Sequence, residues 1–203
     1  MLKTTYEGEE LIHRRLWAIV KEEAKLASER EREWFNPSLV AMVFASHTVE
    51  AYLNFVGERL APEIWKDERN YFRKEHHRGW DGKLRKVMEL VGLPWSPEDR
   101  PLKTILKLKE LRDLIAHGKP EKLEGEIVHA DDTESPFPVS TLNSLVTPKE
   151  KLTMILHDVE QFIEQIHTLA APKVKDKSCV GREALREALG GPPTYSASST
   201  TLM

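Results

Sequence analysis

Apolar side chains recur every three or four residues through most of the first 170 positions, and this periodicity constrains the fold more than any other feature. The strongest stripe runs from Leu152 to Leu169. A stripe of this kind is typical of a helix that buries one face. Weaker stripes occur in four earlier segments, at residues 9–34, 37–61, 84–91 and 97–117. The sequence therefore predicts an all-α bundle of four to five helices.

Three of the predicted helices begin with a capping residue directly followed by proline, at Asn36, Ser96 and Thr147. Such caps accept hydrogen bonds from the first turn, and proline is favoured at the first helical position. Gly92 and Gly118 stand where two helices end, and we expect both to adopt the left-handed conformation that terminates a helix. The buried face of the first helix is expected to carry Ile12, Leu16, Ile19, Val20 and Ala27, and that of the fourth helix Leu102, Ile105, Leu108, Leu111 and Ile115.

The chain is expected to form one helical domain followed by a tail. Residues 1–171 make up the domain, which contains a long loop at 118–146 with a short extended piece at 125–130. From residue 172 to residue 203 the composition shifts to Lys, Ser, Gly, Pro and Thr. Such a segment cannot bury enough apolar surface to offset the entropy of ordering it, so we expect a flexible, disordered tail.

Composition and charge limit the classes of function. Apolar residues make up 40 % and charged residues 31 % of the chain, which suits a soluble globular protein. The net charge of -3 gives no overall attraction to nucleic acid, so any polyanion site must be local. The single cysteine, Cys179, excludes a disulfide within one chain. The most apolar stretch, residues 38–56, is interrupted by His47 and Glu50, so we expect a core helix, no membrane span and a cytoplasmic protein.

The stretch ELRDLIAHGKPE, residues 110–121, places an arginine, a carboxylate and a histidine together at the end of the fourth helix. Asp113 and His117 are four residues apart and share one helix face. Arg112 lies about 7.5 Å behind His117 along the helix axis. One interpretation is purely structural, because cationic side chains in a last turn interact favourably with the negative end of the helix dipole.

A second interpretation comes from a resemblance. The segment LRDLIAHG resembles the signature of HEPN domains, which is an arginine, a polar residue that is often asparagine, three mostly apolar residues and a histidine. Here these positions are Arg112, Asp113, residues 114–116 and His117. The resemblance implies a helical bundle, a homodimer and a metal-independent endoribonuclease without a cofactor. It also implies Arg112 and His117 as catalytic residues, with Asp113 in a supporting role.

The residue types suit that chemistry. An RNA 2′-hydroxyl attacks its own phosphate once a base takes its proton and an acid protonates the leaving oxygen. Histidine serves both roles near neutral pH. The planar guanidinium of arginine suits the phosphate oxygens and the charge that develops on them. One histidine per chain is too few for an acid–base pair, and a twofold dimer would supply the second.

The chain departs from the usual HEPN pattern at two positions. Asp113 stands where asparagine is more common, and its charge either stabilises the imidazolium form of His117 or pairs with Arg112. Lys119 stands where one toxin subset of the family has a tyrosine, so the modification associated with that tyrosine is not expected, and Lys119 is instead a candidate phosphate contact. Some HEPN domains have lost activity, so the alternative is a non-catalytic dimeric module that binds a partner protein, RNA or a nucleotide. A cognate antitoxin is a further expected partner.

A second candidate site is residues 65–86, where eight Lys or Arg residues stand among four Asp or Glu residues and four aromatic ones. Basic residues interleaved with aromatic ones are typical of surfaces that bind single-stranded nucleic acid. The alternative is that the aromatic side chains belong to the core and the charges form a solvated face. On the first interpretation the candidate RNA contacts are Arg69, Arg73, Lys74 and Arg78.

Other polar residues do not define a site from the sequence. His76 and His77 are adjacent, so their side chains diverge, and no nearby ligand completes a metal site. We therefore expect no bound metal. His47 and Glu50 are spaced for a polar pair inside the bundle, unless Glu50 faces the helix that carries the motif.

Overall fold

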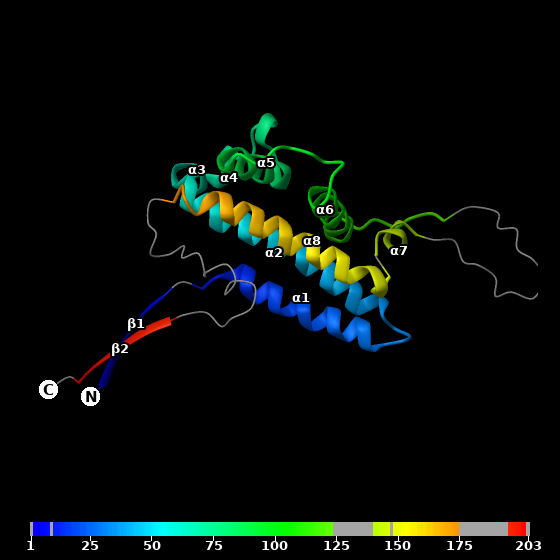
Figure 1. The fold of residues 1–203 in the computed structure, drawn as a ribbon, viewed down its shortest axis with the longest axis horizontal. Coiled ribbons are helices and arrows are strands. Elements are labelled where there is room, and N and C mark those ends of the chain that lie inside the picture. Colours follow the sequence, from blue (N-terminus) through cyan, green and yellow to red (C-terminus); the bar gives the residue numbers. More distant parts are fainter. Residues whose placement is uncertain (1, 9, 124–139, 147, 175–194, 202–203) are drawn as a thin grey trace, which may run out of the picture.

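The computed structural model describes residues 2–8, 10–123, 140–146, 148–174 and 195–201 (Figure 1). In the two terminal segments, 2–8 and 195–201, only the backbone is described. The helices are α1 (Ile12–Glu29), α2 (Phe35–Leu60), α3 (Pro62–Lys66), α4 (Glu68–Tyr71), α5 (Gly79–Val91), α6 (Leu102–Ala116), α7 (Thr141–Leu145) and α8 (Lys149–Ala170), with a 3-10 turn η1 (Glu75–His77) and two strands, β1 (Leu2–Gly8) and β2 (Tyr195–Thr201).

The molecule is an all-α bundle built around α2, which confirms the predicted fold class. Figure 1 shows α2 and α8 side by side, with α1 on one side of them and α5 and α6 on the other. The core consists mainly of apolar side chains from these five helices, with Tyr52, Leu53, Leu84, Leu108 and Phe162 among the most deeply buried. This burial supplies the main driving force for the fold.

Helix α2 is the only helix in the described ranges that is long and apolar enough to cross a membrane by length and composition. Half of the most apolar 18-residue stretch of this helix is buried inside the bundle. It contacts α1, α3, α5, α6 and α8. In this fold, α2 is the central core helix.

The helix boundaries follow the predictions only in part. Helix α5 ends at Gly92, which adopts the expected left-handed conformation with φ of 82°. Gly118 does not have a positive φ, and α6 ends at Ala116 with His117 as its C-cap, so this prediction was wrong. Asn36 lies inside α2, which begins at Phe35. Residues 97–101 form turns before α6, so Ser96 is not its cap.

Helix α8 begins at Lys149 with Pro148 as its N-cap, one residue later than predicted, and the predicted cap Thr147 lies outside the described residues. The extended piece predicted at 125–130 also lies outside the described residues.

The buried face of α1 differs from the predicted stripe. The helix buries Trp17, Val20 and Ala27 together with His13, and leaves Ile12 and Ile19 exposed. Trp17 has the largest apolar surface in this helix, so its burial sets the rotation of the helix against α2. In α6 the predicted face is confirmed for its first four members, but Ile115 is 43 % exposed.

Short elements between α2 and α5 were not predicted. Helix α3 returns along the end of α2, so that the Trp65 ring lies against Gly57. A Cβ at position 57 would overlap that ring, and the Trp65 indole donates a hydrogen bond to Asn54 Oδ1 at 3.3 Å. Segments of four or five residues carry too little periodicity to be recognised in a sequence.

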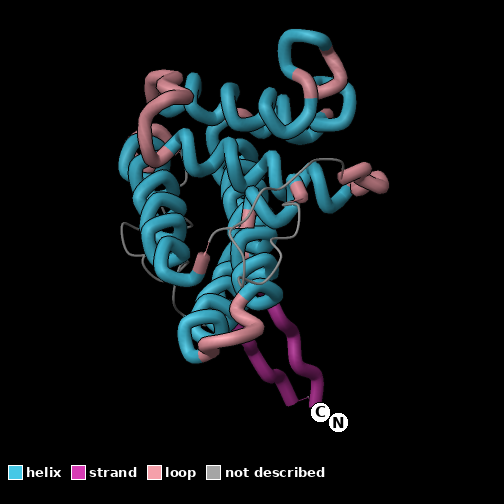
Figure 2. Tube along the Cα trace, turned by 90° about the vertical axis from the view of Figure 1, so that its right-hand side faces the viewer, coloured by secondary structure: helices cyan, strands magenta, loops and turns pink. Residues whose placement is uncertain are grey.

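The two described terminal segments pair as an antiparallel ribbon, with Leu2 opposite Thr201 and Gly8 opposite Tyr195. This ribbon extends away from the helices (Figures 1 and 2). Strand β2 lies within the segment that was expected to be a disordered tail, so residues 195–201 differ from that expectation, while residues 175–194 lie outside the described structure. The pairing depends on the other end of the chain, which a local sequence pattern does not reveal.

A small polar cluster lies within the core where α1 begins and α8 ends. The hydroxyl of Tyr52 and Nδ1 of His167 are 3.1 Å apart, and the ring of His13 packs edge-on against Tyr52 with centroids 5.2 Å apart. The Nε2 atoms of both histidines are buried and have no hydrogen-bond partner in the described part of the chain. Burial, followed by the proximity of Arg14, lowers the pKa of His13 to about 4. Burial and then the charge of His13 lower the pKa of His167 to about 3.

Candidate functional site

The motif arginine, Arg112, lies in the last turns of α6 and is held by two carboxylates. Its Nη1 donates to Asp113 Oδ1 at 2.9 Å, and its Nη2 donates to Glu50 Oε2 at 3.1 Å. Glu50 comes from the middle of α2, which packs directly against α6. The guanidinium is therefore fixed between its own helix and the central helix of the bundle.

These contacts belong to a longer chain of alternating charges that joins four helices. From Asp113 the chain continues to Lys109 at 3.0 Å and then to Asp81 of α5 at 3.4 Å. From Glu50 it continues to Lys83 of α5, at 3.9 Å, and Lys83 pairs closely with Glu68 of α4. Each carboxylate that contacts Arg112 thus also contacts a lysine. We call these seven residues the charge network.

Asp113 is ionised within this network. Its partial burial opposes ionisation, but hydrogen bonds from Arg112 and Lys109 outweigh that effect and hold the pKa of the carboxyl below its usual value. Burial likewise opposes the charge on Lys109, yet its contacts with Asp113 and Asp81 raise the pKa of the amine. Of the two roles considered for Asp113, the structure shows the pairing with Arg112.

His117 lies at the open end of α6 and is exposed to solvent. Its backbone N–H donates to the carbonyl of Asp113 at 3.0 Å. Within the described ranges, no side chain forms a hydrogen bond or an ion pair with its imidazole, although Asp113 is on the same face of the helix. Both ring nitrogens are accordingly available to a ligand or a substrate.

The structure joins Arg112 and Asp113 by a hydrogen bond, whereas the imidazole of His117 pairs with neither side chain, and it adds residues that the sequence pattern missed. Glu50 faces the motif helix, which was one of two alternatives for this residue, and His47 instead lies edge-on to Phe44. Nothing in the sequence links Glu50 to Arg112, which follows 62 residues later. Lys119 is exposed beyond the end of α6.

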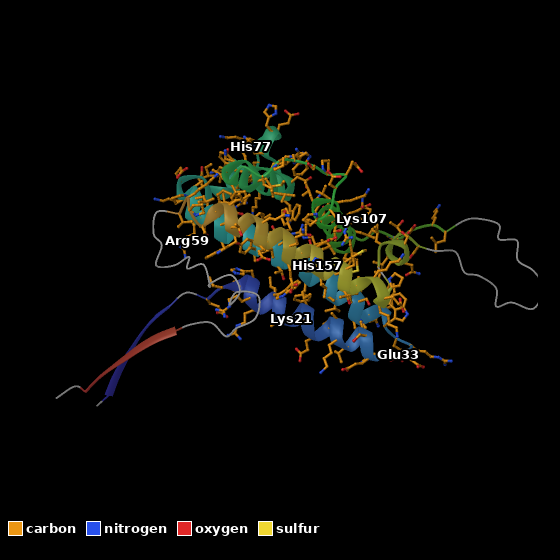
Figure 3. All side chains as sticks on the ribbon, viewed as in Figure 1. Lys21, Glu33, Arg59, His77, Lys107 and His157 are labelled. Atoms are coloured by element: carbon orange, nitrogen blue, oxygen red, sulfur yellow. The ribbon has the colours of Figure 1, made fainter. Side chains whose placement is uncertain are left out.

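The second candidate site divides into a buried and an exposed part. Trp65, Phe72 and Trp80 are core side chains, so they are not available to stack on bases. Tyr71 is half-buried and stacks on His77 with ring centroids 5.0 Å apart. Figure 3 shows His77 at the outer edge of the molecule, beyond α5. The aromatic component of the predicted RNA surface is therefore mainly core.

The exposed part consists of the predicted basic contacts. All four are solvent-accessible and lie on the short segments around α4 and η1, namely Arg69, Arg73, Lys74 and Arg78. We call these four residues the basic patch. Arg78 is the N-cap of α5, three residues before Asp81, which contacts Lys109 on α6. The basic patch and the charge network therefore both include a residue at the start of α5.

The described part of the chain contains no group of three or more His, Cys, Asp or Glu side chains placed to hold a metal ion. The chain matches no protein-family model, and it has no significant match among curated proteins or solved structures. The geometry of the Arg112–His117 helix end and its surroundings is consequently the basis for the functional proposal.

Proposed function

We propose that the protein is a metal-independent endoribonuclease of the HEPN type that cleaves single-stranded RNA. The observation that carries the proposal is the arrangement at the end of α6: His117 is exposed with a free imidazole, and Arg112 is fixed one turn behind it. A phosphate between these side chains would meet an acid–base group and a rigid bidentate donor.

In the proposed reaction, one His117 takes the proton of the RNA 2′-hydroxyl, which attacks the adjacent phosphorus. A second His117 protonates the 5′-oxygen that leaves, and a 2′,3′-cyclic phosphate forms. Arg112 stabilises the negative charge on the phosphate oxygens. The basic patch and Lys119 bind the flanking phosphates.

The second histidine would come from a homodimer in which two α6 ends face one another. Ile115 supports this part of the proposal, because it is a large apolar side chain that stays exposed two residues before His117. Sedimentation at micromolar concentration is expected to give twice the chain mass, and Ile115→Asp to give monomers. A wild-type protein that stays monomeric with RNA bound would contradict the composite site.

The proposed setting is the cytoplasm, where such a nuclease would act as a toxin or a defence effector. A toxic nuclease requires restraint, so a cognate antitoxin or another inhibitory protein is the proposed partner. Expression of the wild type in the absence of that partner is expected to slow cell growth, whereas His117→Ala is expected to be tolerated.

The reaction is tested with purified protein and a labelled single-stranded RNA in EDTA. We expect cleavage that persists in the chelator and products that end in 2′,3′-cyclic phosphate, because the attacking group belongs to the RNA itself. Loss of cleavage in EDTA, or products that end in 3′-hydroxyl, would contradict this mechanism.

One observation favours the alternative, a non-catalytic module. Two carboxylates contact Arg112, which reduces its attraction for a phosphate. On this alternative the protein binds RNA, a nucleotide or a partner protein without cleaving it. Tight RNA binding by both wild type and His117→Ala, with intact RNA recovered from each, would identify the binding module.

A further inference from the structure

We propose that Glu50 and Lys83 are positioning residues that hold the guanidinium of Arg112 in the orientation needed for a phosphate. This inference rests on the proposed function for its catalytic consequence, but the positioning itself is a property of the fold. Neither residue belongs to the helix that carries the motif.

Two residues support Arg112 in succession: Glu50 contacts Arg112, and Lys83 contacts Glu50. Glu50 Oε2 accepts from Arg112 Nη2 at 3.1 Å, and Glu50 Oε1 lies 3.9 Å from Lys83 Nζ. The side chain of Lys83 is only 10 % exposed and that of Glu50 is 23 % exposed. Lys83 also pairs with Glu68 and lies 6.0 Å from the centre of the Phe72 ring. Because Lys83 contacts the other oxygen of the Glu50 carboxylate, this carboxylate has little freedom to move away from Arg112.

The charge network carries three positive charges, on Lys83, Lys109 and Arg112, and four negative charges, on Glu50, Glu68, Asp81 and Asp113, so its sum is -1. This support therefore adds nothing to the attraction of Arg112 for a phosphate. Its contribution is to fix the direction of the guanidinium, because Glu50 is itself paired with Lys83.

The hydrogen-bond donors of Arg112 also indicate that the direction of its guanidinium is fixed. A guanidinium has five N–H groups in a rigid plane. Glu50 and Asp113 accept from one Nη atom each, so at least two N–H groups of those atoms and the Nε–H remain for other acceptors. Because the plane is fixed by two contacts from different helices, the direction of the remaining donors is fixed as well.

The first test measures Arg112 directly and requires no activity. In ¹⁵N-edited NMR spectra of guanidinium groups, a held arginine rotates slowly about its Nε–Cζ bond. We expect slow rotation for Arg112 in the wild type and rotation at least about tenfold faster in Glu50→Ala, because a hydrogen bond to a charged acceptor is lost. Glu50→Gln keeps an acceptor and is expected to give an intermediate rate.

Arg100 provides an internal control, since its guanidinium is held by Asp158 and not by Glu50. Its rotation should be the same in all three proteins, which also shows that the bundle is intact. An Arg112 rotation rate that is unchanged in both Glu50 variants, with Arg100 also unchanged, would overturn the inference.

The second test uses the proposed reaction. Misplacement of Arg112 should lower kcat by about tenfold to a hundredfold in Glu50→Ala, with a smaller change in KM and partial recovery in Glu50→Gln. A fall in KM without loss of kcat would mean that Glu50 merely competes with phosphate, and would overturn the inference. If the wild type does not cleave RNA at all, the proposed nuclease function fails, while the rotation measurement still decides whether Glu50 positions Arg112.

Discussion

At the scale of single residues, Asp113 and Glu50 contact the same guanidinium but are expected to affect it differently. Asp113 lies on the face of α6 that leads to His117, where a bound phosphate would sit, and its side chain is 33 % exposed. Glu50 approaches from the core side of the helix. The exposed carboxylate therefore repels an incoming phosphate more strongly than the supported one.

Asp113→Asn is accordingly predicted to strengthen RNA binding by about threefold, a size typical of one exposed charge contact. The comparison is best made in a His117→Ala background, where RNA stays intact, by fluorescence anisotropy at two salt concentrations. The gain should shrink at the higher salt concentration because exposed charges are screened. Weaker binding by the double variant would show that Asp113 supports the site instead of restraining it.

The spacing within the motif could be predicted from the sequence, because Arg112, Asp113 and His117 lie on one helix and helical geometry fixes their relation. The residues from other helices that contact Arg112 or its partners could not be predicted in this way. Glu50 and Lys83 reach the site only through the packing of α2 and α5 against α6 or each other, and a single sequence holds no record of that packing. For the same reason the burial of Trp65, Phe72 and Trp80 became visible only in the fold.

The buried histidines predict that the folded protein becomes less stable at acidic pH. The pKa of His13 falls from its usual 6.5 to about 4 on folding, so the unfolded chain binds a proton more readily than the native one. Its contribution to stability is complete above pH 6.5 and is lost as the pH falls toward 4. Between pH 7 and pH 5 this group alone should reduce the free energy of unfolding by roughly 2 kcal/mol.

His13→Phe tests this effect, because a phenyl ring keeps the packing against Tyr52 and Phe55 but does not titrate. Urea unfolding is compared at pH 7 and pH 5 for the wild type and the variant. The difference between the two pH values should be smaller in the variant by roughly 2 kcal/mol. An equal difference in both proteins would show that the acid sensitivity comes from other groups.

At the scale of elements, α6 and α8 are tied together by a buried carboxylate. Asp158 of α8 is fully buried, accepts two hydrogen bonds of 2.7 Å from Arg100 and also accepts from the hydroxyl of Thr104. Arg100 lies in the turn just before α6 and Thr104 in its first turn. This contact anchors the start of the helix whose far end carries His117.

Asp158→Ala should lower the free energy of unfolding by about 1–3 kcal/mol, because it leaves the buried Thr104 hydroxyl without its acceptor. The matched control is Glu98→Ala, which removes an exposed pair with Lys103 from the same turn and should cost less than about 1 kcal/mol. Chemical denaturation measures both. Equal effects of the two substitutions would contradict the assignment of the buried contact as the anchor.

The elements also show which parts of a helical fold can be predicted from one sequence. The apolar stripes predicted at residues 84–91 and 152–169 are regular, and most of their apolar side chains are buried in α5 and α8. In α1 the buried face includes His13, a polar residue that packs on Tyr52, so counting apolar residues identified Val20 and Ala27 correctly but wrongly included Ile12 and Ile19. At the end of α6, Ile115 continues the apolar spacing but is exposed.

At the scale of the whole molecule, the bundle separates stability from the proposed chemistry. The apolar core is formed mainly by α1, α2, α5, α6 and α8, whereas the charge network joins polar side chains of α2, α4, α5 and α6. His117 is exposed at the end of α6 and is not part of the core. Its side chain can therefore be replaced with little effect on the fold, which makes a clean functional comparison possible.

The most direct test compares His117→Ala with His157→Ala in the EDTA cleavage assay. His157 is an exposed histidine on α8, outside the proposed site, and so provides a matched loss of one imidazole (Figure 3). We predict that His157→Ala cleaves single-stranded RNA at the wild-type rate, while His117→Ala loses activity by at least about a thousandfold, the order expected when an acid–base residue is removed. Cleavage at equal rates by all three proteins would contradict the assignment of His117 as a catalytic residue.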